Sequence, residues 1–68
     1  MPLYYLDVFY PGEPVCRERV ALEAASAVLG GIPELLDRHR GCERILVSCE
    51  GARLFAVDGQ GNTVREPS

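Results

Sequence analysis

The spacing of apolar and polar residues changes twice along the chain, which predicts strands at both ends and a helix between them. From Val20 to Arg40, apolar residues recur every three or four positions, which corresponds to one face of a helix. They are Ala21, Leu22, Ala25, Val28, Leu29, Ile32, Leu35 and Leu36. Residues 3–10 and 44–57 are short runs rich in β-branched and aromatic residues, which are typical of strands. We therefore expect the helix to cover one face of a small sheet.

The first of these strands is apolar on both of its faces. Alternation places Tyr4, Leu6, Val8 and Tyr10 on one face and Leu3, Tyr5, Asp7 and Phe9 on the other. The run at residues 45–57 has the same two-sided pattern. A sheet that faces water on one side has polar residues on that side. Because one helix covers only one face, we expect another molecule to cover the second.

Residues 14–19 fit two structures, a strand that pairs with the first strand or the start of the helix. Pro14 favours an extended Glu13. Arg17 and Arg19 are unfavourable near the positive end of a helix dipole. Both observations favour a short extended segment, with the helix beginning close to Val20.

Glycine and proline interrupt the predicted helix near its middle. Gly30 and Gly31 weaken a helix, and Pro33 removes one backbone hydrogen bond. A kink or break near Gly31 is therefore expected. A bend that follows the twist of the sheet is the favoured explanation over a hinge or a close-packing patch.

The clearest local signal is a β-hairpin formed by residues 44–49 and 52–57, turning at Glu50–Gly51. Residues 58–62 predict a further turn, and residues 63–65 a brief last strand. The predicted fold is a single α+β domain over residues 1–68. It has an antiparallel sheet of three to four strands and one kinked helix packed on one face, in the order β-α-β-β.

The chain is small and acidic, which limits its partners. It has 68 residues and a net charge of −3, with ten acidic residues against seven arginines and no lysine. A domain of this size buries only about 60% of its unfolded surface, so a partner is expected to add stability. The arginines alternate with acids, as in residues 17–19 and 37–40, which does not favour direct binding of nucleic acid. No apolar run approaches the roughly 18 residues of a membrane span.

The cysteines give no disulfide or zinc pattern. Cys16, Cys42 and Cys49 are odd in number and lack the close Cys-x-x-Cys spacing of zinc sites. The first ten residues have no basic residue and run into a Pro-Gly turn, unlike a secretory signal. We expect unpaired cysteines, no metal and no cofactor, and a cytoplasmic location.

No group of residues has the spacing of a catalytic site. His39 and Cys42 are close in sequence, but no third residue is placed to orient the imidazole. The acids Asp7, Glu43, Glu50 and Asp58 punctuate strands without converging. Residues 58–62 lack the glycine and the terminal glutamate of a calcium loop. An enzyme is therefore not expected.

The function predicted from this pattern is a small non-enzymatic interaction module, a homodimer that self-associates through its sheet. The contact face would carry some of Tyr4, Tyr5, Phe9, Phe55 and Val57. One alternative is a small acidic inhibitor or adaptor that docks on a larger protein, as anti-defence proteins of mobile elements do. The other is a thiol- or metal-dependent catalyst using Cys42, Cys49 and His39.

Overall fold

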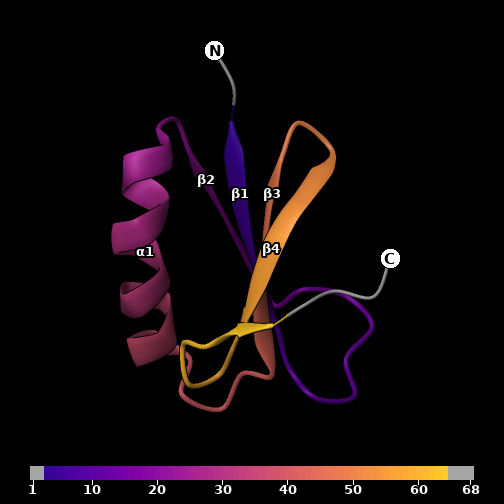
Figure 1. The fold of residues 1–68 in the computed structure, drawn as a ribbon. Helices are drawn as coiled ribbons and strands as arrows, with labels where there is room; N and C mark the ends of the chain where they lie inside the picture. Colours follow the sequence, from indigo (N-terminus) through magenta and orange to yellow (C-terminus); the bar gives the residue numbers. More distant parts are fainter. Residues whose placement is uncertain (1–2, 65–68) are drawn as a thin grey trace.

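The computed structural model describes residues 3–64, which form a five-stranded antiparallel sheet with one helix on one face (Figure 1). The elements are β1 (Tyr4–Phe9), β2 (Glu18–Leu22), α1 (Ala25–Arg38), β3 (Arg44–Cys49), β4 (Ala52–Asp58) and β5 (Thr63–Val64). Their order across the sheet is β2-β1-β3-β4-β5. The strongly apolar strands β1 and β3 therefore lie inside the sheet, as expected for strands that are apolar on both faces. The predicted α+β class is confirmed.

The strand count and the element order differ from the prediction. Residues 3–64 form five strands in the order β-β-α-β-β-β, and not three or four in the order β-α-β-β. The order changes because residues 18–22 pair with β1 as a full strand, with Leu6 opposite Val20. Residues 20–22 match the spacing of a helix and of a strand equally, and pairing with β1 decides between them. The helix consequently begins at Ala25, and the extended segment continues past Arg19.

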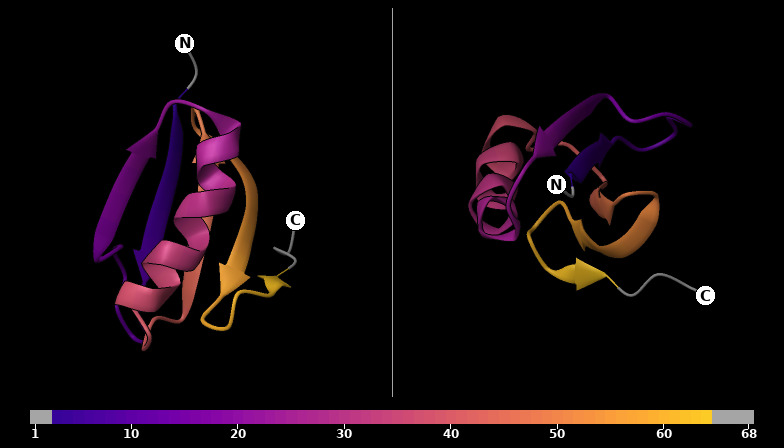
Figure 2. Two further views of the ribbon diagram at one scale, coloured as in Figure 1. Left: turned by 90° about the vertical axis from the view of Figure 1, so that its left-hand side faces the viewer. Right: turned by 90° about the horizontal axis from the view of Figure 1, so that it is seen from above.

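Helix α1 continues through Gly30, Gly31 and Pro33 as one helix, so no break occurs near Gly31 (Figure 2). Proline removes only one backbone hydrogen bond. Burial on both sides of Pro33 holds the helix on the sheet, through Val28, Ile32 and Leu35. Gly31 has a packing role, because a Cβ there would lie 3.2 Å from Leu6 Cδ1 and 3.4 Å from Leu22 Cδ1.

The predicted hairpin at Glu50–Gly51 is confirmed between β3 and β4. Both turn residues have positive φ, 51° at Glu50 and 85° at Gly51. Two such residues are typical of the tight turn whose twist matches that of the strands. The register of the hairpin shifts between Val47 and Ser48, so that Val47 lies opposite Phe55 and Ser48 opposite Arg53. This bulge leaves Leu54 as the extra residue of β4.

The turn and the short last strand expected after β4 are also present. The backbone amides of Gln60 and Asn62 donate to Asp58 Oδ1 at 2.9 and 3.0 Å. Strand β5 pairs with Ala56 and Val57 of β4. Arg65, the last residue expected in that strand, lies outside the described residues.

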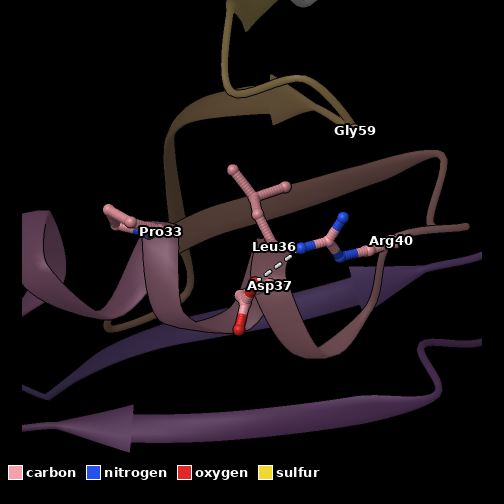
Figure 3. Close-up of a pocket in the computed structure, with 5 residues that line it drawn as sticks. All are labelled: Pro33, Leu36, Asp37, Arg40 and Gly59. Carbon is pink, nitrogen blue, oxygen red and sulfur yellow. Dashed lines mark hydrogen bonds and ion pairs between the residues drawn. The ribbon is translucent and has the colours of Figure 1, made fainter.

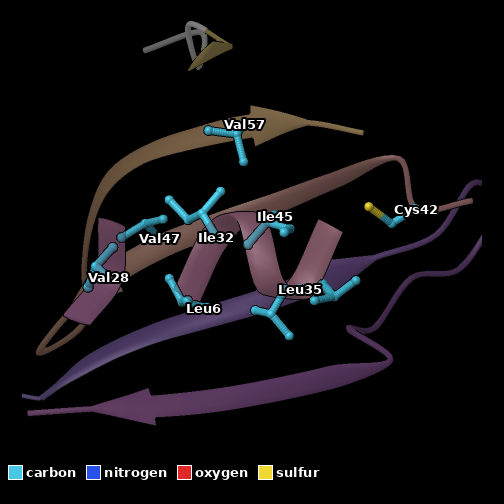
Figure 4. Close-up of a cluster of buried hydrophobic side chains, with 9 residues drawn as sticks. Leu6, Val28, Ile32, Leu35, Cys42, Ile45, Val47 and Val57 are labelled. Atoms are coloured by element: carbon cyan, nitrogen blue, oxygen red, sulfur yellow. The ribbon is translucent and has the colours of Figure 1, made fainter. Parts of the chain in front are cut away.

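The core lies between α1 and the sheet (Figure 4). It consists of Leu6, Val8, Val28, Ile32, Leu35, Cys42, Ile45, Val47 and Val57. Four of them, Leu6, Val8, Ile45 and Val47, are fully buried on the central strands. Helix α1 packs mainly against β1 and β2, which leaves part of β3 and β4 without a helix over them (Figure 2). No helix within residues 3–64 combines the length and the apolar character needed to span a membrane.

Candidate functional site

The sheet face opposite the helix, here called the open face, has at its centre an ion pair whose carboxylate is buried. Asp7 lies opposite Arg19 on β2 and Leu46 on β3. The side chain of Arg19 donates twice to this carboxylate, from Nε to Oδ1 at 2.7 Å and from Nη2 to Oδ2 at 3.0 Å. Asp7 is only 4% exposed, whereas Arg19 reaches the surface. The two-pronged geometry neutralises a carboxylate that would be costly to bury alone.

Aromatic side chains surround this ion pair on the same face. The guanidinium carbon of Arg19 lies 5.1 Å from the centre of the Tyr5 ring, and that of Arg44 lies 5.1 Å from the centre of the Phe9 ring. Both separations are within the range of cation–π attraction. Hydrogen bonding and the charge of Asp7 raise the pKa of Arg19, so the guanidinium stays charged. The open face is therefore a layer of aromatic rings and guanidinium groups over a neutralised carboxylate.

The five residues predicted for a contact face divide between the two faces of the sheet. Tyr5 and Phe9 are half-buried on the open face. Tyr4 and Phe55 pack against the helix-side core, and Val57 is buried within it at 4% exposure. Val57 is therefore a core residue. Which side chains of a strand point toward the helix decides on which face each residue lies. In β4, the bulge also changes which residues point toward the helix.

Sequence reasoning missed the pairing of Asp7 with Arg19. A lone acid within the apolar run of residues 3–10 was a signal that a buried partner exists. The alternation of Arg17, Glu18 and Arg19 looked like a mixed surface. In a strand, successive side chains point to opposite faces, so Arg19 faces Asp7 while Glu18 lies on the helix side.

A second polar cluster joins the end of α1 to β2. His39 Nε2 donates to Glu18 Oε1 at 2.5 Å, and the Tyr10 hydroxyl lies 2.8 Å from His39 Nδ1. Arg38 Nη2 donates to Glu18 Oε2 at 3.2 Å. The bond from His39, followed by the charge of Arg38, holds the pKa of Glu18 below its usual value.

Tyr10, His39 and Glu18 form a chain of hydrogen bonds like that of a nucleophile, a base and an orienting acid. A catalytic site also needs a cavity in which a substrate reaches the nucleophile. The two hollows described below are lined by other residues. Both ring nitrogens of His39 are already engaged by protein groups, which suits a structural link between α1, β1 and β2.

The three cysteines, which were expected to be unpaired, do not form a common site in the structure. Cys42 is buried, Cys16 and Cys49 are half-buried, and all three are free thiols. Burial raises the pKa of the Cys42 thiol, which makes it a poor nucleophile. Within residues 3–64, no three His, Cys, Asp or Glu side chains converge as a metal site would require.

An open hollow of about 470 Å³ lies between the second half of α1 and the turn after β4 (Figure 3). Its lining is Pro33, Leu36, Asp37, Arg40 and Gly59. Arg40 Nη2 donates to Asp37 Oδ1 at 3.1 Å, and both side chains are largely exposed. An exposed ion pair of this kind is weak and well solvated. The hollow therefore offers little to distinguish a ligand from water.

A smaller hollow of about 210 Å³ has an apolar lining and is here called the apolar groove. It lies on the helix side and is lined by Tyr4, Ala25, Val28, Leu29, Val47, Leu54 and Phe55. Leu29 is 71% exposed and Leu54 50% exposed. Large aliphatic side chains with this exposure, on either side of one groove, are typical of a contact surface.

Comparisons with protein-family models, with curated proteins and with solved structures gave no match for this chain.

Proposed function

We propose that the protein is a small non-enzymatic interaction module that self-associates as a homodimer through the open face of its sheet. The observation that carries this proposal is the Asp7–Arg19 pair, with Tyr5 and Phe9 on either side of Asp7 along the same face of β1. Tyrosine and arginine are enriched among the residues that contribute most to protein interfaces. Because Arg19 neutralises Asp7, the centre of this face carries no net charge, and two copies meet there without repulsion.

A second copy also fits the size of the chain. A symmetric dimer buries the same patch twice, and a stable interface takes about 800 Å² from each partner. That is less than a fifth of the 4558 Å² that the chain exposes. A domain this small has a core of marginal stability. Even a small net free energy of association, after its entropic cost, would therefore add usefully to the stability of the fold.

The partner in this proposal is protein, and the compartment is a reducing one such as the cytoplasm. Arg17 and Arg19 already pair with Glu13 and Asp7, which leaves them less available to phosphate groups. The free thiols of residues 16, 42 and 49 suit a reducing environment.

Sedimentation equilibrium at micromolar concentration tests the dimer. The wild-type mass should exceed the 7.5 kDa of one chain, and the melting temperature should rise with protein concentration. Tyr5→Glu places an unpaired charge on the open face and should shift the mass to that of a monomer. Leu29→Glu adds the same charge to an exposed apolar position on the helix side and should leave the mass unchanged. A well-folded wild-type monomer at every concentration would contradict the proposal.

A further inference from the structure

Arg19 has hydrogen-bonding capacity on the open face that the chain itself does not use. A guanidinium has five N–H groups, and Asp7 accepts from two of them, through Nε and Nη2. No acceptor for the remaining N–H groups is present within residues 3–64. The side chain of Arg19 is 58% exposed, so in a single chain these groups bind water.

Two hydroxyl groups beside the ion pair are also unused by the chain. Tyr5 and Ser48 lie opposite each other on β1 and β3, so their side chains share the open face. Both residues are half-buried, and neither hydroxyl forms a hydrogen bond with another residue in the described part of the chain. The open face therefore has charged donors next to neutral oxygen acceptors. A surface that carries both can bind a second copy of itself.

Asp7 and the ring of Tyr5 hold the guanidinium of Arg19 in one orientation. Asp7 is 4% exposed on an inner strand of the sheet and accepts two hydrogen bonds from Arg19. The centre of the Tyr5 ring lies 5.1 Å from the guanidinium carbon. A side chain that is already fixed loses little conformational freedom when it binds a partner. Asp7 is thus a positioning residue, which acts through Arg19.

From these observations we propose that Arg19 is the principal donor across the dimer interface, where it binds the hydroxyl oxygens of Tyr5 and Ser48 in the second copy. Asp7 sets the direction of its N–H groups. In a symmetric dimer the contact occurs twice, once from each copy. Hydrogen bonds from a charged donor are stronger than those between neutral groups. This inference rests on the dimer proposed above and specifies the contact that stabilises it.

Arg19→Lys separates the planar guanidinium from its charge. Lysine keeps the positive charge beside Asp7 but lacks the fixed fork of N–H groups. The dissociation constant of the dimer, measured by sedimentation equilibrium, should rise at least about tenfold. Arg40→Lys makes the same substitution in an exposed ion pair after α1 and should leave the dissociation constant unchanged.

Removal of the two acceptors should have a matching effect. Tyr5→Phe combined with Ser48→Ala keeps the aromatic ring and deletes both hydroxyl groups. The dissociation constant should again rise at least about tenfold. Adding Arg19→Lys to this variant should raise it little further, because both changes remove the same contact.

The positioning role of Asp7 has a readout in the effect of salt. Asp7→Asn leaves the charge of Arg19 unbalanced in each copy, so the two faces repel each other. The dimer of this variant should be weaker than that of the wild type, and added salt should strengthen it by screening the repulsion. Asp7→Asn combined with Arg19→Gln retains an uncharged pair at the same positions. Its dimer should be weak at every salt concentration, and circular dichroism should show a folded chain.

The failure of this inference is distinguishable from failure of the dimer itself. A wild-type dimer whose dissociation constant is unchanged by Arg19→Lys, or by loss of both hydroxyl groups, would overturn the proposed contact alone. Additive effects of these changes would assign them to separate contacts and also overturn it. An Asp7→Asn dimer with wild-type affinity and salt dependence would refute the positioning role. A wild-type monomer at every concentration would refute the dimer and this contact with it.

Discussion

At the scale of single residues, two glycines of this chain have opposite environments. A Cβ at Gly59 would lie 2.5 Å from the carbonyl oxygen of Cys42, whereas a Cβ at Gly30 would meet nothing within 4 Å. Gly59 therefore allows the turn after β4 to approach the backbone before β3. Gly30 lies on the exposed side of α1, where glycine only costs conformational entropy.

Substitution of these glycines by alanine should change stability in opposite directions. Gly59→Ala should lower the free energy of unfolding by about 1–3 kcal/mol, because backbone must move to make room. Gly30→Ala should raise it by about 0.5–1 kcal/mol. Urea denaturation followed by circular dichroism measures both. A Gly59→Ala variant as stable as the wild type would refute the close approach to Cys42.

At the scale of elements, the end of α1 is tied to β2 by Glu18, which binds His39 and Arg38. This link joins the helix to β2, the strand that pairing with β1 establishes. The same end of the helix is tied to β1 through Tyr10, whose ring meets that of His39 edge to face at 5.8 Å between centroids. One carboxylate and one imidazole therefore connect three elements.

The link predicts a loss of stability in acid. The pKa of Glu18 is lower in the folded protein than its unfolded value of about 4.3. The contribution of Glu18 to the free energy of unfolding is therefore fully present above that pH and is lost as the pH falls below it. Asp58, whose pKa is lowered by the backbone amides of Asn62 and Gln60, acts in the same direction. Melting temperatures between pH 7 and pH 3 should therefore fall most steeply below about pH 4.3.

Two variants isolate the contribution of Glu18. Glu18→Gln should be less stable than the wild type at pH 7 and should show a shallower fall in acid. Glu34→Gln removes an exposed carboxylate from α1 and should keep the wild-type slope. An unchanged slope in Glu18→Gln would show that the link contributes nothing to stability.

At the scale of the whole molecule, the chain already has the dimensions of a compact globule. Its accessible surface of 4558 Å² is close to the roughly 4,200 Å² expected for a monomer of 7.5 kDa. Its radius of gyration of 11.1 Å is also close to the roughly 11 Å expected for its length. Self-association would thus add stability to a closed core.

Because no set of metal-ligating side chains converges within residues 3–64 and the three thiols are unpaired, we expect neither metal nor disulfide chemistry to influence folding. The melting temperature should be the same, within about 1 °C, with EDTA, with a thiol reductant and with neither. Elemental analysis of protein prepared without chelator should find no stoichiometric zinc. A large fall in melting temperature on chelation, with zinc released, would instead revive the thiol- or metal-dependent catalyst.

Local patterns in the sequence determined most of the elements of this protein. The two-sided strand β1, the turn at Glu50–Gly51 and the turn after Asp58 follow from residue types and short-range geometry, which act within a few positions. The apolar spacing of α1 likewise includes Val28, Ile32 and Leu35, which pack on the sheet, although Leu29 on the same predicted face is 71% exposed. These features need no information about distant residues.

Three features were decided by tertiary structure alone. They are the strand conformation of residues 18–22, the continuity of α1, and the residues that make up the open face and the apolar groove. Pairing with β1 turned an ambiguous segment into a strand, and burial on both sides of Pro33 outweighed the loss of one hydrogen bond. The partners Asp7 and Arg19 are twelve positions apart, and Leu29 and Leu54 meet only across the groove. Such contacts depend on the register of the strands and on the bulge in β4. A shift of one residue in register would move every side chain of a strand to the other face of the sheet. Only the packing of the whole chain therefore determines the register.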